Sequence, residues 1–216
     1  IESFVFFNAI ILNPFLHMFC SMSPVSFFST ASGFIIVNVL FIIIIYANLK
    51  KIISIYIFVL MKDIKVLLSN KKNIVITMHK NPDCDALGSS LGLAHVLVNM
   101  GHNVKVISPN SYPEFLNWLP GQEKVLIYEN NITESENIIS DSDIIFCLDF
   151  NNLKRLGDMK TLIENSDSYK ILIDHHENPN SFCDFMFSVP SKSSTCEMIY
   201  DFAVNFGFID KIDSSS

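Results

Sequence analysis

Short apolar runs alternate with amphipathic stretches between residues 61 and 216. The runs hold four to six residues each and are rich in β-branched side chains, which is typical of strands buried in a parallel sheet. We expect strands at Asn73–Met78, Asn103–Ser108, Lys124–Tyr128, Asp143–Leu148 and Lys170–Ile173.

Two of the intervening stretches predict helices. Ala86–Met100 has apolar residues at helical spacing and ends before Gly101, a residue that commonly terminates a helix. Ser194–Phe206 is the second predicted helix, and it begins near the hydroxyl-rich stretch Ser191–Thr195. Strands that alternate with helices predict an α/β fold with a mostly parallel, Rossmann-like sheet flanked by helices on both faces.

The first sixty residues follow another pattern and form an apolar segment, which we expect to be helical. Their only charged side chains are Glu2, Lys50 and Lys51. Residues 33–49 are long and apolar enough to span a bilayer, and the two lysines that follow would favour the cytoplasmic side. The alternative is a mis-extended reading frame, because the composition resembles translated AT-rich DNA and Met61 opens an ordinary soluble sequence. We therefore place a domain boundary between residues 60 and 61.

Charge narrows the range of partners. The net charge is −7, and nearly all charged residues lie in residues 61–216. Binding to long duplex nucleic acid needs many lysines and arginines that displace counterions, so this composition argues against it. A small anionic substrate held locally by metal ions remains compatible with the charge.

The cysteines favour a reducing, cytoplasmic compartment. Their number is odd and none of them forms a C-x-x-C pair, which argues against both a disulfide framework and a zinc–thiolate site. They are Cys20, Cys84, Cys147, Cys183 and Cys196.

Three clusters of acidic and histidine residues follow predicted strands directly. The first is the stretch from His79 to Asp85, the second is Asp149, and the third is Asp174-His175-His176. Each also has a structural explanation: Asn-Pro-Asp is a common turn, an aspartate can cap a helix or end a strand, and adjacent histidines can face solvent. Ligands of open parallel sheets bind outside the carboxyl ends of strands, so the joint placement of all three clusters favours a site.

The residue types in these clusters indicate hard or borderline divalent cations, with Mn²⁺ expected and Mg²⁺ as the alternative. Two such ions about 4 Å apart can share a bridging carboxylate, activate water and neutralise a phosphoryl group. Asp83 and Asp85 are two residues apart, so each could serve a different ion.

These residues resemble the DHH phosphoesterase family, which is named for the triplet that stands here as Asp174-His175-His176. The family motif H-x-x-P-D-x-D-A-x-G-S is present from His79 to Ser89, Asp149 matches the isolated aspartate of a second motif, and residues 193–202 resemble the S-S-T-x-E segment. The resemblance covers residues 61–210.

The resemblance implies a role for each matching residue. One metal ion would be held by His79, Asp83 and Asp149, and the other by Asp85, Asp149 and His175. His176 would lie near the substrate phosphate, and Asp174 would orient its neighbours, so these two are the expected catalytic pair. Substrate-binding positions by the same resemblance are Ser89, Ser194 and Thr195, with helix capping as the alternative for the last two.

Within the family, the stretch from Ser108 to Gly121 is similar to the bacterial oligoribonuclease/pAp phosphatase branch. That branch implies cleavage of short oligoribonucleotides and removal of the 3′-phosphate from pAp, and family analogy implies a homodimer. The alternatives are a cyclic-dinucleotide phosphodiesterase, a pyrophosphatase-like hydrolase and an inactive binding module. The family also carries a further metal-binding aspartate and a C-terminal substrate domain, which we expect beyond Ser216.

Overall fold

The computed structural model describes residues 42, 45–49 and 64–212, and the chain divides into two compact units, Ile1–Lys65 and Val66–Ser216. In the first unit, residues 42, 45–49 and 64–65 are helical. Most of the apolar segment predicted for residues 1–60 lies outside the described residues. Within the described part of the chain, no helix is both long and apolar enough to cross a membrane.

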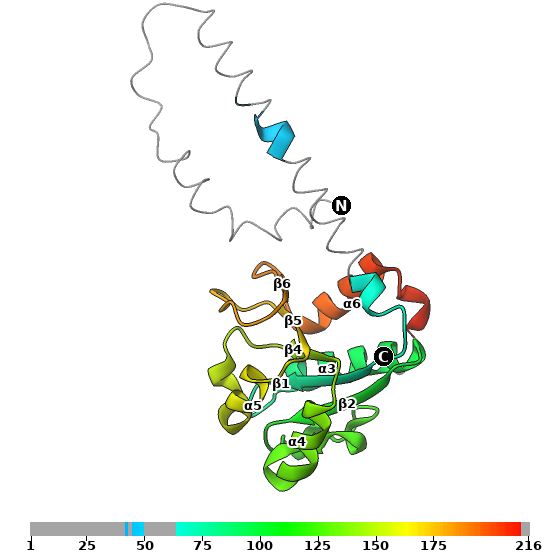
Figure 1. The fold of residues 1–216 in the computed structure, drawn as a ribbon, viewed down its shortest axis with the longest axis vertical. Helices are drawn as coiled ribbons and strands as arrows, with labels where there is room; N and C mark the ends of the chain where they lie inside the picture. The colour runs from blue at the N-terminus through cyan, green and yellow to red at the C-terminus, as the bar shows by residue number, and fades with distance from the viewer. Residues whose placement is uncertain (1–41, 43–44, 50–63, 213–216) are drawn as a thin grey trace, which may run out of the picture. The chain divides into compact units, whose positions relative to one another are not determined.

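The second unit contains a six-stranded, fully parallel sheet in the order β3-β2-β1-β4-β5-β6 (Figure 1). This is the strand order of the doubly wound Rossmann fold, which confirms the predicted α/β class. The strands are β1 (Asn73–Met78), β2 (Asn103–Ser108), β3 (Leu126–Ile127), β4 (Ile144–Leu148), β5 (Tyr169–Asp174) and β6 (Phe185–Ser188).

The chain changes direction across the sheet between β1 and β4. It leaves β1 toward β2 and β3 on one side, then returns to form β4 against the other side of β1, with Ile76 opposite Phe146 in the register. The loops that follow β1 and β4 therefore diverge, and a crevice at the carboxyl ends of these two strands is the usual ligand position in such sheets.

The predicted strands agree with the structure except at the sheet's outer positions. β1 and β2 have the predicted bounds, and β4 and β5 differ from them by one residue at one or both ends. The strand predicted at Lys124–Tyr128 shortens to the two residues of β3, because 3-10 turns take up its two ends. β6 is an additional strand that pairs with β5.

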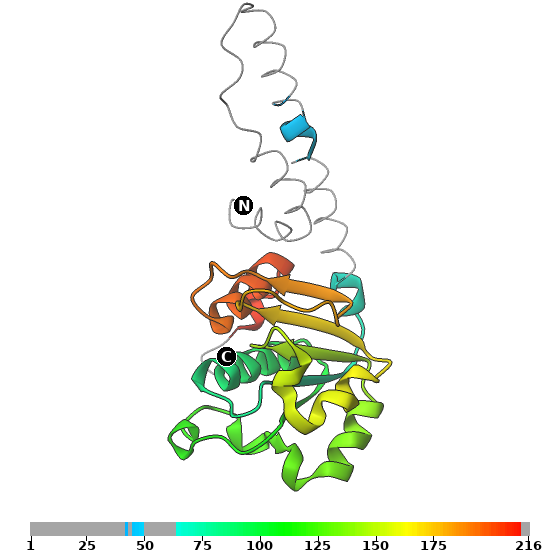
Figure 2. The ribbon, with the colours of Figure 1, turned by 90° about the vertical axis from the view of Figure 1, so that its left-hand side faces the viewer.

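Helices cover both faces of the sheet (Figure 2). On one face lie α3 (Cys84–Asn99) and α6 (Thr195–Phe206), which contact each other and the central strands. On the other face lie α4 (Ile132–Ser140) and α5 (Lys160–Glu164). The 3-10 helix η6 (Leu153–Met159) directly precedes α5 and lies on the same face. Among the described residues, the other 3-10 helices are η3 (Glu114–Leu116), η4 (Gln122–Lys124), η5 (Tyr128–Asn130) and η7 (Ile209–Lys211).

Strand alternation divides the core between these two layers. Val75, Ile145 and Leu172 pack with residues of α4, α5 and η6 in one cluster of buried side chains. Phe146, on the opposite face of β4, meets Phe202 of α6 edge to face. All five residues of β4 are buried, as expected for a central parallel strand covered on both sides. The rigid sheet thus fixes the loops that follow its carboxyl ends.

Candidate metal centre

The structure brings the three predicted clusters together at the carboxyl edge of the sheet. His79 follows β1, Asp149 follows β4, and Asp174 is the last residue of β5, directly before His175 and His176. Asp83 and Asp85 stand at the start of α3, and Asp83 is the residue that caps this helix.

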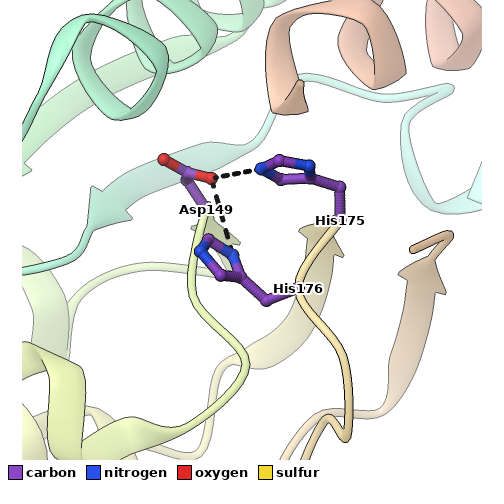
Figure 3. Close-up of side chains that lie close together, drawn as sticks. All are labelled: Asp149, His175 and His176. Carbon is purple, nitrogen blue, oxygen red and sulfur yellow. Dashed lines mark ion pairs between the residues drawn. The ribbon is translucent and has the colours of Figure 1, made fainter. Parts of the chain in front are cut away.

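Asp149 is the common member of the cluster. It is almost completely buried, with 2% of its surface exposed, and its backbone adopts a left-handed φ of 62°. Its Oδ2 lies 3.5 Å from His79 Nε2, and its Oδ1 lies 3.6 Å from His175 Nε2. Figure 3 shows His175 and His176 converging on this carboxylate, with His176 Nδ1 at 3.8 Å. One buried carboxylate therefore faces three imidazoles.

The first side of the centre consists of His79, Asp83 and Asp149, whose ligand atoms lie within 4.8 Å of one another. Asp83 uses Oδ1 to accept hydrogen bonds from two backbone amides of α3, and its Oδ2 lies 4.0 Å from His79 Nε2. His79 Nδ1 lies 2.9 Å from the carbonyl of Lys80, so it is the protonated nitrogen in that bond and Nε2 is directed at the carboxylates.

Opposing effects act on the pKa of His79. Burial lowers this pKa, but the hydrogen bond and negative charge of Asp149, together with the Lys80 carbonyl, raise it by more. The net pKa is above the ordinary histidine value. The imidazole is thus held in a strongly negative environment that would equally stabilise a bound cation.

The second side contains Asp149, His175 and His176, which also lie within 4.8 Å of one another through one ligand atom each. Asp85 joins it, since its Oδ2 lies 3.7 Å from His175 Nε2. The Asp85 carboxylate rests on the first turn of α6, accepting hydrogen bonds from the backbone amides of Thr195 at 2.7 Å and Cys196 at 2.9 Å. The first turn of α6 therefore holds the Asp85 carboxylate in a fixed position beside His175.

Asp174 and His176 form a separate pair within this arrangement. Asp174 is fully buried, and its Oδ1 lies 2.7 Å from His176 Nδ1. Burial raises the pKa of Asp174, and its contacts with His176 offset only part of this rise. The pair fixes the His176 ring and leaves Nε2 as the nitrogen that can face a substrate.

The three predicted substrate positions have different surroundings. Ser194 caps α6, with Oγ accepting from the Glu197 amide at 3.1 Å. Thr195 is buried, and its hydroxyl donates to Asp149 Oδ1 at 2.8 Å. Ser89 is buried inside α3, where its hydroxyl donates to the carbonyl of Ala86 at 3.2 Å. The structure brings Thr195 into the centre, keeps Ser194 at its edge and directs Ser89 into its own helix.

The residues present suit a divalent cation. Asp149 is a buried carboxylate whose ion-pair partners, within the described part of the chain, are all histidines. A buried carboxylate is costly unless a cation or several donors compensate it, and a mixed carboxylate–imidazole set is the ligand chemistry of Mn²⁺ and related ions.

Besides the contacts of Asp85 with the first turn of α6, two further supporting contacts were not predicted from the sequence. One is the Thr195 hydroxyl on Asp149, and the other is the carbonyl of Lys192, which accepts from His175 Nδ1 at 3.2 Å. The Ser194-x-x-Glu197 spacing is a capping-box signature and could have marked the start of α6. No local pattern indicates which distant carboxylate that helix start would contact.

Acidic and imidazole side chains gather at the carboxyl edge of a doubly wound sheet, beside the two strands between which the chain changes direction. This arrangement defines an α/β domain with a candidate divalent-metal centre. Comparison with known protein families matches residues 73–214 to the N-terminal domain of the DHH family. The chain belongs to the DHH family.

Several known proteins share this domain. The chain is 30% identical over 136 residues to a probable bifunctional oligoribonuclease and PAP phosphatase, NrnA, of Streptococcus mutans, covering 61% of this chain and 38% of that protein. It is 26% identical over 144 residues to the cyclic-di-AMP phosphodiesterase GdpP of Bacillus subtilis, covering 63% and 22%. A crystal structure of an exopolyphosphatase-related protein from Bacteroides fragilis superposes with a TM-score of 0.69 and 38% identity, covering 72% of this chain and 46% of that one. The chain thus spans less than half the length of each relative.

Proposed function

We propose that this chain is the metal-binding domain of a phosphoesterase that hydrolyses short oligoribonucleotides, 3′-phosphoadenosine 5′-phosphate (pAp) or both. The observation that carries the proposal is the position of Asp149. Its two carboxylate oxygens face opposite sides of the centre, Oδ2 toward His79 and Oδ1 toward His175. This is the arrangement expected of a carboxylate shared by two cations.

His79, Asp83 and Asp149 would hold one ion, and Asp85, Asp149 and His175 would hold the other. When bound, a pair of divalent cations supplies an activated water and neutralises charge on the phosphoryl group. Mn²⁺ is the proposed ion because imidazoles contribute to both sides, whereas sites for Mg²⁺ are mostly built from oxygen ligands and water.

His176 is the proposed substrate-facing residue. The Asp174 carboxyl holds its Nδ1, and about a third of the side chain is exposed. With Nδ1 engaged, Nε2 can donate a hydrogen bond or a proton to a phosphate oxygen. Asp174 acts as a positioning residue in this proposal, since it is fully buried and reaches the substrate only through His176.

The substrate class rests on the relatives. The Streptococcus mutans protein is named as a probable oligoribonuclease and PAP phosphatase. The family match over residues 73–214 covers the part of this chain that holds the cluster. Both reactions break a phosphate ester of a small nucleotide, which is compatible with an acidic domain.

A cyclic-dinucleotide phosphodiesterase is the second candidate. The observation in its favour is the similarity to GdpP, whose name specifies cyclic di-AMP. The same metal centre would serve either reaction, so the distinction is one of substrate shape.

A substrate panel tests the proposal. The purified chain would be loaded with Mn²⁺ and given pAp, a diribonucleotide, cyclic di-AMP and inorganic polyphosphate. We expect phosphate release from pAp or mononucleotides from the diribonucleotide, with loss of activity in Asp149→Asn. Preferred turnover of cyclic di-AMP would favour the second candidate. A folded, Mn²⁺-loaded chain that is inactive on all four, both alone and when extended through its downstream reading frame, would contradict both.

A further inference from the structure

The peptide unit that joins Lys192 to Ser193 contacts His175, one of the residues of the candidate centre. It lies in the connection between β6 and α6. Its carbonyl oxygen accepts a hydrogen bond from His175 Nδ1 at 3.2 Å. A carbonyl can only accept, so Nδ1 carries the hydrogen and Nε2 is left to face Asp85 and Asp149. The direction of this carbonyl therefore decides which His175 nitrogen is presented to a cation.

The same peptide unit is held from its other side by Glu197. The Ser193 amide donates to Glu197 Oε2 at 3.0 Å, and the Ser193 hydroxyl donates to the same oxygen at 2.8 Å. The N–H and C=O of a trans peptide point in opposite directions, so fixing the amide on Glu197 aims the Lys192 carbonyl at His175. Glu197 thus controls His175 through one rigid plane.

The Lys192 side chain also holds this connection to α6. Its Nζ contacts Glu197 Oε1 at 2.9 Å and Asp201 Oδ2 at 2.6 Å, and only 19% of the side chain is exposed. Both of these acidic residues belong to α6, so the lysine ties the connection to the helix over its first two turns. The anchor therefore joins two segments that meet at the metal centre.

Glu197 also belongs to the first turn of α6. Its amide donates to the hydroxyl of the cap residue Ser194, and its carboxylate reaches back to the amide of Ser193, one residue before the cap, so the contact resembles a capping box displaced by one residue. The neighbouring amides of Thr195 and Cys196 hold Asp85, and the Thr195 hydroxyl holds Asp149. The Glu197 carboxylate thus holds the Lys192–Ser193 peptide that supports His175, and it belongs to the helix turn whose amides support Asp85.

We infer that Glu197, anchored by Lys192, is a positioning residue for the second proposed ion, which Asp85, Asp149 and His175 would hold. The inference rests on the proposed two-metal function. The first side shares this support only through Asp149, because His79 is oriented by the Lys80 carbonyl and Asp83 by the amides of α3. Loss of Glu197 should consequently weaken the binding of one ion much more than that of the other.

Three variants test this with two measurements. Glu197→Met removes both carboxylate oxygens while keeping a helix-forming side chain of similar length. Glu197→Gln keeps one acceptor for the Ser193 amide. Glu164→Met is the control, because Glu164 also pairs with a lysine, Lys160, but on α5 at the other face of the sheet. The measurements are the imidazole tautomer of His175 by ¹⁵N NMR in the metal-free chain, and Mn²⁺ binding by calorimetry.

The expected result is selective. Glu197→Met should convert His175 from a single Nδ1–H form to a tautomer mixture and weaken one Mn²⁺ by about 10- to 100-fold, the usual effect of losing an outer hydrogen-bond partner. Glu197→Gln should stay close to the unchanged chain, and Glu164→Met should match it in both measurements.

Two results would overturn the inference: an unchanged His175 tautomer in a folded Glu197→Met chain, or equal weakening of both ions. Failure of the unchanged chain to bind Mn²⁺ would instead remove the proposed function. The tautomer measurement needs no metal, so it would still decide whether Glu197 positions His175.

Discussion

The Thr195 hydroxyl donates a hydrogen bond to Asp149 Oδ1 at 2.8 Å, joining the first residue of α6 to the residue that follows β4. Both side chains are buried and lie 46 positions apart in the chain. The bond fixes the orientation of the carboxylate that lies between the two sides of the candidate centre. The start of α6 is therefore part of the centre, although none of its side chains was expected to bind metal.

Replacing Thr195 with valine tests this bond. Valine keeps the side-chain shape but removes the hydroxyl donor from Oδ1 of the buried Asp149 carboxylate, and hydrogen bonds to charged groups contribute about 1.5–3 kcal/mol. We expect Thr195→Val to lose stability in this range in urea unfolding of the metal-free chain. Thr195→Ser, which keeps the hydroxyl, should lose much less. Equal losses in the two variants would show that the methyl group, and not the hydroxyl, matters.

The backbone of Asp149 leads to a second prediction. Its φ of 62° lies in the left-handed region, which asparagine tolerates and which costs alanine about 1–2 kcal/mol. Asp149→Asn should therefore be more stable than Asp149→Ala by up to about this amount, although both remove the charge. Thermal unfolding of the two metal-free variants measures the difference. Equal stabilities would mean that the loop relaxes to another conformation.

The capping carboxylate of Glu197 gives a prediction about pH. The hydrogen bond from Lys192, together with those from Ser193, lowers the pKa of Glu197 to about 2, whereas an unfolded glutamate has a pKa of about 4.3. A depressed folded pKa means that the stabilisation is fully present above pH 4.3 and is lost as the pH falls toward 2.

The stability of the unchanged chain should thus fall more steeply between pH 5 and pH 2.5 than that of Glu197→Gln, which has no titrating group at this position. Urea unfolding at several pH values gives both slopes. Parallel curves would indicate that Glu197 is solvated in the folded chain and that Lys192 does not hold it.

Phe202 packs α6, the helix whose first turn reaches the candidate centre, against the sheet. It is fully buried in α6 and contacts Phe146 of β4 edge to face, with ring centroids 6.1 Å apart. Phe202→Ala should lower the free energy of unfolding by about 3–5 kcal/mol. Tyr200→Ala, at an exposed position of the same helix, should change it far less. A small effect at Phe202 would mean that the sheet does not hold α6 in place.

The sequence predicted the central strands because each is a run of apolar residues of the length that a buried parallel strand needs. β1 and β2 have the predicted bounds. β6 could not be found in this way, because Phe185–Ser188 is short and owes its conformation to pairing with β5. β3 is shorter than the predicted strand because only Leu126 and Ile127 pair with β2.

The acidic and histidine residues of the centre were also predictable, because three strand ends carried them. Their supports were not. Asp85 meets the amide of Thr195 across 110 positions, and His175 meets the Lys192 carbonyl through a backbone group that has no residue signature. Such contacts arise from how α3, β5 and α6 pack together, which no local pattern encodes.

The number of Mn²⁺ ions bound by the chain tests the central claim most directly. Calorimetric titration combined with electron paramagnetic resonance would give both the number and any magnetic coupling between ions. If Asp149 is shared, the unchanged chain should bind two coupled Mn²⁺ ions, and Asp149→Asn should weaken both together. A single ion, or two ions that bind Asp149→Asn as tightly as the unchanged chain, would contradict the shared-carboxylate centre.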